Sequence, residues 1–150
     1  MSYFTAVLAR DGQKWSPHIV DVEALEDLAE LSVALRAVAD DEESVLLFVE
    51  REDAWWAVVR VDADDDPRVF VSDVLAAAAS PYAQVLDVAE SDEAEGIEAG
   101  TPYGDSDVLA DLGTPPEALT QMCEEELVPM DALAAIAEAG GFAEVLDSLR

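Results

Sequence analysis

The chain is short of positive charge. Seven Lys and Arg stand against 35 Asp and Glu, which gives a formal net charge of −28 over 150 residues. A field of this sign repels nucleic acid and anionic membranes alike, because both carry dense negative charge. We therefore expect neither direct nucleic-acid binding nor binding to a membrane surface.

Metal ligands, thiols and long apolar runs are equally scarce. One Cys and one His exclude a disulfide framework and a zinc site built within this chain, since both need several such residues together. No uninterrupted apolar run exceeds six residues, whereas a membrane-spanning helix needs about 20. The first basic residue is Arg10, so the start lacks the cationic stretch of a secretory signal, and we expect a cytoplasmic protein.

Strand patterns dominate the first half of the chain. Apolar residues make up 51% of the sequence, which is enough to fold. Residues 3–9 and 13–20 flank Asp11-Gly12 and predict a hairpin, in which Pro17 confines the second strand to a sheet edge. Residues 45–50, 55–61 and 68–72 predict three more strands, and their short connections favour antiparallel pairing.

The strand over 55–61 has two different faces. Trp55, Ala57, Val59 and Val61 point one way, whereas Trp56, Val58 and Arg60 point the other. We expect a helix on the first face. Trp56 lies either beneath another helix, which we favour, or in an exposed contact patch.

Helical patterns flank the strands. Leucines recur at helical spacing over residues 23–39 and predict one long helix packed on the sheet. Residues 73–86 predict a second helix, broken at Pro81. We read 87–104 as an acidic linker, and short helices follow over 106–113, from Pro116, over 129–139 and over 142–149.

These patterns predict an α+β fold. A mainly antiparallel N-terminal sheet domain with one long helix (1–86) precedes the acidic linker (87–104) and a C-terminal module of short helices (105–150). The module is small for independent stability, so we expect it to dock on the sheet or on a partner. Residues 69–149 contain 18 Asp and Glu and no Lys or Arg, and that surface either serves solubility or meets a basic protein.

Catalytic and metal-binding motifs are absent from the sequence. Asp62, Asp64, Asp66 and Asp73 follow calcium-loop spacing, but Pro67 occupies the position that requires Gly. We assign His18 to a strand edge and Cys123 to the apolar face of a helix. No nucleophile elbow or phosphate-binding loop occurs, so we expect a protein that is not an enzyme and needs no cofactor.

Several short motifs together resemble a known family. They are Val7-Leu8-Ala9-Arg10-Asp11-Gly12 with Trp15, the run 56–61 leading to Phe70-Val71-Ser72-Asp73, Leu109-Ala110-Asp111-Leu112-Gly113, Cys123-Glu124-Glu125, Asp131-Ala132-Leu133-Ala134-Ala135-Ile136-Ala137 and Gly141-Phe142. Over essentially its full length the chain is similar to the actinobacterial tRNA adenosine deaminase-associated proteins. The resemblance implies an accessory partner of that enzyme and supplies no catalytic residues.

The chain cannot itself be a zinc deaminase. Such enzymes need an H-x-E or C-x-E ligand motif together with a P-C-x-x-C pair. Cys123-Glu124-Glu125 has the C-x-E spacing, but Cys123 is the single Cys of the chain, so no P-C-x-x-C pair occurs. The leading hypothesis is therefore a non-enzymatic protein that binds a tRNA adenosine deaminase, or another basic protein, by electrostatic complementarity. Candidate contacts are Trp56, Glu124, Glu125 and Glu126. The alternatives are a nucleic-acid mimic that blocks basic sites on other proteins, and a small carboxylate- or metal-dependent hydrolase.

Overall fold

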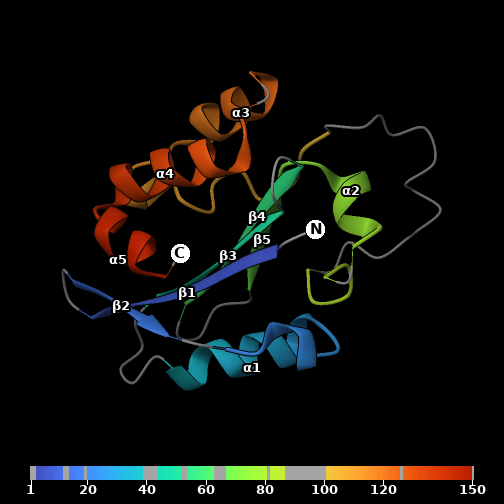
Figure 1. The fold of residues 1–150 in the computed structure, drawn as a ribbon, viewed down its shortest axis with the longest axis vertical. Coiled ribbons are helices and arrows are strands. Elements are labelled where there is room, and N and C mark those ends of the chain that lie inside the picture. Colours follow the sequence, from blue (N-terminus) through green and yellow to red (C-terminus); the bar gives the residue numbers. More distant parts are fainter. Residues whose placement is uncertain are drawn as a thin grey trace.

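A six-stranded sheet lies between two helical layers (Figure 1). The computed structural model describes residues 3–11, 14–18, 20–38, 44–51, 54–62, 67–80, 82–86, 101–125 and 127–149. Within these residues every strand pairing is antiparallel. The predicted α+β class and antiparallel sheet are therefore confirmed.

The strands follow the order β2-β1-β3-β4-β5-β6. They are β1 (Tyr3–Asp11), β2 (Lys14–His18), β3 (Val45–Arg51), β4 (Trp55–Val61), β5 (Arg68–Val71) and β6 (Tyr103–Gly104). As predicted, Pro17 lies in an edge strand, where its missing N–H costs no sheet bond. The sequence did not predict β6, which falls at the end of the expected linker. Residues 87–100 of that linker lie outside the described residues.

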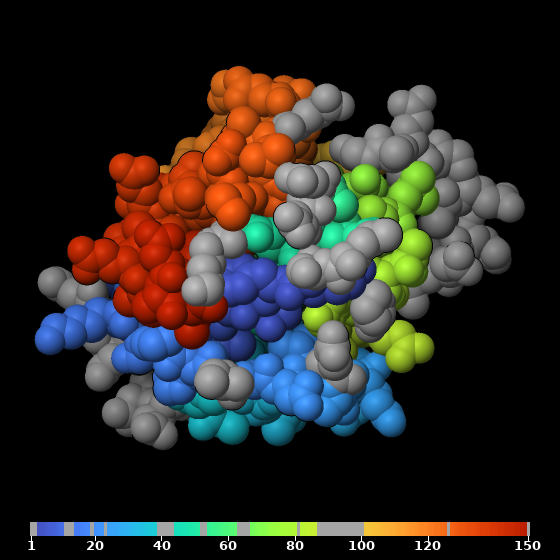
Figure 2. Space-filling model, viewed as in Figure 1, coloured from blue at the N-terminus to red at the C-terminus, as the bar shows by residue number. Residues whose placement is uncertain are grey.

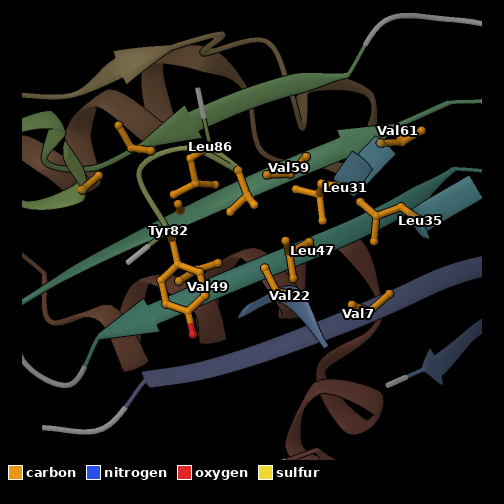
Figure 3. Close-up of a cluster of buried hydrophobic side chains, with 14 of the residues drawn as sticks. Val7, Val22, Leu31, Leu35, Leu47, Val49, Val59, Val61, Tyr82 and Leu86 are labelled. Carbon is orange, nitrogen blue, oxygen red and sulfur yellow. The ribbon is translucent and has the colours of Figure 1, made fainter. Parts of the chain in front are cut away.

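The first face of the sheet packs against helix α1 (Leu28–Val38). The sheet side chains Val7, Leu47 and Val59 alternate onto this face and meet Leu31 and Leu35 of α1, both fully buried (Figure 3). Tyr82, Val85 and Leu86 complete the same apolar cluster.

Both predicted N-terminal helices are shorter than expected. Residues 23–39 were predicted as one helix, but a 3-10 turn (Val22–Ala24) and an extended Leu25 precede α1. Asp27 accepts a hydrogen bond from the Glu30 N–H at 2.8 Å and so starts α1 there. In place of a helix over 73–86, α2 (Val74–Ala78) forms, capped by the Asp73 side chain.

The C-terminal helices cover the second face of the sheet (Figure 1). They are a 3-10 turn (Ala110–Leu112), α3 (Pro116–Glu124), α4 (Pro129–Gly140) and α5 (Ala143–Ser148). Phe142 packs between Trp15 and Phe48, with ring centroids 5.0 and 5.7 Å away. The module thus docks on the sheet of its own chain, while its status as a separate domain stays a prediction.

The ends of these helices follow the sequence only in part. Gly113 and Gly141 adopt positive φ angles, and they end the 3-10 turn and α4. Pro116 stands at the first position of α3, as predicted. Pro115 is the N-cap residue of α3 and makes no side-chain hydrogen bond, and Thr114 before it is buried. No helix within the described residues is long and apolar enough to cross a membrane.

Candidate partner-binding surface

One buried cation ties the C-terminal helices to the sheet. Arg60 lies on β4 on the same face as Trp56, and it is only 5% exposed. A guanidinium in such a place needs charged and polar partners, because it has lost its hydration. In the sequence, the one signal for a buried ion pair is that Arg60 occupies an inward-facing position of a strand.

The C-terminal segment supplies most of these partners. Asp111 accepts two hydrogen bonds from Arg60, one from Nη1 and one from Nη2, the second at 2.9 Å. Arg60 Nη1 also donates to the carbonyl oxygen of Val108 at 3.0 Å. This paired geometry is the strong form of an Arg–carboxylate contact. It fixes the start of the C-terminal module against the sheet.

Asp62 extends the cluster along the strand edge. Its Oδ1 accepts from Arg60 Nε at 3.0 Å and from Ser44 Oγ at 2.5 Å, and its Oδ2 accepts from Arg68 Nη2 at 3.3 Å. Arg60 and Arg68 stand opposite each other on β4 and β5. Asp62 therefore separates two like charges that would otherwise repel across the strands. We call Arg60, Asp62, Arg68 and Asp111 the arginine cluster.

The cluster shifts the pKa values of its members. The hydrogen bonds to Asp111 raise the pKa of Arg60 against the opposing effect of burial. The same contact with Arg60 lowers the pKa of Asp111. Burial acts to raise the pKa of Asp62, but hydrogen bonds from Ser44 and Arg60 outweigh it and lower the pKa. All three groups are therefore charged at neutral pH, and the arrangement anchors the fold.

The outer side of the C-terminal helices carries acids with few internal counterions. Exposed members are Glu117, Glu124, Glu125, Asp131, Glu138, Glu144 and Asp147. The sequence from 69 to 149 holds no Lys or Arg, so the cations that Asp105 and Asp111 meet come from β4 and β5. Figure 2 shows this module as one continuous orange and red surface above the sheet.

Two exposed apolar side chains interrupt the acidic surface. Val128 precedes α4 and is 44% exposed, and Met130 in its first turn is 56% exposed. They follow Glu124 and Glu125 at the end of α3, and Asp131 comes next in the chain. We call Glu124, Glu125, Val128, Met130 and Asp131 the α3–α4 corner. Apolar side chains with a charged rim are the composition expected of a protein-binding surface.

The candidate contacts from the sequence fall in different places. Glu124 and Glu125 are exposed at the α3–α4 corner, while Glu126 lies outside the described residues. Trp56 is 2% exposed beneath the C-terminal helices, with its ring centroid 5.5 Å from that of Phe70. Its side chain is therefore part of the core, the position favoured from the sequence, and a partner does not reach it at the surface.

The other residues that the sequence singled out for possible chemistry, Cys123, His18, Asp62 and Asp73, have structural positions. Cys123 is partly buried against the apolar cluster between the second face of the sheet and the C-terminal helices. Burial, with a smaller effect of Glu124, raises its pKa to about 11. His18 lies on the edge strand β2. Asp62 belongs to the arginine cluster and Asp73 caps α2, while 63–66 lie outside the described residues. No group of three or more potential metal ligands occurs in the described part of the chain.

Comparison with known proteins identifies the family. A family model described as Rv3753c-like tRNA adenosine deaminase-associated protein matches residues 3–143. The chain belongs to this family. The match spans both the sheet and the C-terminal helices, so the resemblance expected from the sequence is confirmed. No curated protein and no solved structure matches the chain. The description of the deaminase-associated family names an associated protein and not the deaminase itself.

Proposed function

We propose that this chain is a non-enzymatic accessory protein that binds a tRNA adenosine deaminase. The observation that carries the proposal is its membership of the deaminase-associated family, matched over residues 3–143. With a single Cys, the chain also lacks the P-C-x-x-C pair that a zinc deaminase uses to hold its metal. It would therefore act by binding the enzyme, and it would not itself deaminate the adenine base.

Charge complementarity supports such a partnership. An enzyme that grips tRNA must present Lys and Arg to the phosphates. The C-terminal helices present the opposite charge, with seven exposed acids on α3, α4, α5 and their ends. Complementary fields raise the association rate and suppress wrong partners more than they raise affinity. The acidic surface would thus steer the two proteins together.

The α3–α4 corner is the part of that surface best suited to hold a partner. Val128 and Met130 offer apolar area that a partner can remove from water. Glu124, Glu125 and Asp131 flank them and would pair with cations at the rim of the contact. We place the centre of the interface there. The arginine cluster would act indirectly, since it holds the helices that carry the corner.

Co-purification from the native host tests this proposal. A tagged chain should bring down the deaminase at low salt, and the variant E124K/E125K should lose it. The matched control is E26K/E30K, which reverses two exposed acids before and within α1 on the other side of the sheet. Each Glu→Lys change raises the net charge by two, so the two double variants change the net charge equally. Loss of the deaminase in both variants, or in neither, would contradict the proposed surface.

Competition with tRNA then locates the contact on the enzyme. If the acidic surface lies over the RNA-binding groove of the deaminase, added tRNA should release the chain. If it docks beside that groove, a ternary complex should form. Release of nucleic acid from unrelated basic proteins as well would favour the alternative of a general nucleic-acid mimic.

A further inference from the structure

A groove of about 650 Å³ opens between β6 and α3. Its lining residues are Phe70, Pro102, Tyr103, Gly104, Asp105, Ser106 and Thr120. This volume lies within the range of about 300–1,000 Å³ that is usual for binding pockets. The groove shares no residue with the α3–α4 corner and therefore constitutes a separate feature of the surface.

The backbone along one side of the groove is held firmly in place. Asp105 N–H donates to the carbonyl oxygen of Val69 at 2.8 Å, and Val74 N–H donates to that of Thr101 at 2.9 Å. Gly104 between them has a φ of +110°, and a Cβ atom there would lie 2.1 Å from the Val69 oxygen. Only glycine allows β6 to lie so close to β5. A ligand would thus meet a preformed wall, which lowers the entropic cost of binding.

The lining combines an aromatic ring, a carboxylate and hydroxyl groups. Tyr103 is 54% exposed, the most solvent-accessible aromatic ring in the described residues, while Phe70 is buried. Asp105 Oδ1 accepts from the Asp107 N–H at 3.0 Å, and Arg68 Nη1 lies 3.9 Å from its Oδ2. A carboxylate has about four acceptor sites, so Asp105 retains capacity for a further donor. Ser106 and Thr120 add hydroxyl groups.

This set of groups fits a guanidinium. A guanidinium stacks on aromatic faces and donates several hydrogen bonds in one plane, which suits an exposed Tyr beside a carboxylate. Exposed aromatic rings also stack on nucleobases, but a nucleic acid brings phosphates, which a net charge of −28 repels. None of the described residues that line the groove is a cation that would pair with an acidic ligand.

We propose that the groove between β6 and α3 binds an arginine side chain presented by a basic protein. The guanidinium would pair with Asp105 and lie against the ring of Tyr103, and its remaining N–H groups would face the hydroxyls of Ser106 and Thr120. The assignment concerns the chemistry of the groove and holds whichever basic protein carries the arginine. It therefore stands or falls separately from the association with a deaminase.

Titration of the full-length ¹⁵N-labelled protein with Nα-acetyl-arginine methylamide tests the assignment by NMR. Saturable shifts should appear at the amides of Tyr103, Gly104, Ser106 and Thr120. The citrulline analogue has nearly the same shape but no charge, and it should cause no saturable shift. The lysine analogue should bind more weakly, because an ammonium lacks the planar set of donors.

Variants separate the groove from the general field of the protein. D105N should weaken arginine binding at least about tenfold, since it removes the charged acceptor. Y103A should weaken it about two- to fivefold through loss of the stacking contact; because Tyr103 is exposed, this variant also guards against a D105N protein that fails to fold. The control D147N removes the same charge from α5, outside both the groove and the α3–α4 corner, and should leave binding unchanged.

Four results would overturn the assignment. Three of them are the absence of saturable shifts with the arginine analogue, equal shifts with the citrulline analogue, and equal weakening in D105N and D147N. Binding of the lysine analogue as tight as that of the arginine analogue would refute recognition of a guanidinium.

Discussion

Replacement of Arg60 by Met removes the charge of the arginine cluster while it keeps a long apolar stem. Loss of one partner from a buried ion pair costs about 3–5 kcal/mol when the other charge stays buried. Here Asp111 has a 61% exposed side chain and regains water, whereas Asp62 is only 21% exposed. The Val108 carbonyl also loses a donor. We therefore expect R60M to lower the free energy of unfolding by about 2–3 kcal/mol.

Urea unfolding followed by tryptophan fluorescence measures this loss, because Trp55 and Trp56 are buried on β4, the strand that also carries Arg60. In a chain of this length the melting temperature should fall by about 4–12 °C. R68M is the matched control. Arg68 is one-third exposed and its contacts are 3.3 and 3.9 Å long, so its loss should cost no more than about 1 kcal/mol. An R60M protein as stable as the wild type, or an equal loss in R68M, would refute this account of the cluster.

Three further predictions concern pH, a thiol and two glycines. The pKa values of Asp62 and Asp111 lie below their ordinary 3.8, so the ionised carboxylates stabilise the fold above that pH and this stabilisation is lost as the pH falls. The difference in unfolding free energy between wild type and D111N should therefore shrink from about pH 5 to about pH 3. A constant difference would contradict this. Because the pKa of Cys123 is raised to about 11, iodoacetamide at about pH 8 should alkylate it about a hundredfold more slowly than an unhindered cysteine, and an equal rate would exclude that shift. In chemical denaturation, G104A should lower the free energy of unfolding by at least about 3 kcal/mol, because its Cβ atom would clash with the Val69 oxygen. In G141A the new Cβ atom meets nothing within 4 Å, so the loss should be only about 1 kcal/mol. Equal losses would rule out the clash.

Local sequence patterns were sufficient to predict strands β1 to β5 and the direction of the side chains along β4. Alternation over 55–61 placed Ala57 and Val59 on one face and Val58 and Arg60 on the other, and the two apolar cores have this division. A side chain in a strand points to one of only two faces, so the assignment needs no knowledge of distant residues. The position of Pro17 on a sheet edge followed from its missing backbone N–H alone.

Helix ends were harder to predict, because short-range preferences compete there. Glu23 to Asp27 carry acids suited to a helix start, yet Asp27 acts as the cap and delays α1 to Leu28. The predicted break at Pro81 did not show that α2 already ends at Ala78. The Asp27 cap sets where α1 begins, and residues 82–86 pack into the apolar cluster on the first face of the sheet without continuing α2. Periodicity reports neither of these.

The arginine cluster could not be found from local spacing. Arg60 and Asp111 are 51 positions apart, and Asp111 is one of 35 acids any of which has the right chemistry. The fold selects among them: of the acids that the structure describes, Asp111 on the C-terminal turn and Asp62 after β4 are the two that reach the guanidinium. Burial of Trp56 likewise depends on where the C-terminal helices dock.

The central claim is that the acidic C-terminal helices bind a tRNA adenosine deaminase through the α3–α4 corner. The most direct measurement is the dissociation constant of the purified chain and the purified deaminase of the same organism at increasing salt, for the wild type and for M130S/V128S. The account predicts binding at low salt that weakens steeply as salt rises, and a further loss in the variant at every salt concentration. Absence of binding at low salt, or an affinity that neither salt nor the variant changes, would contradict it.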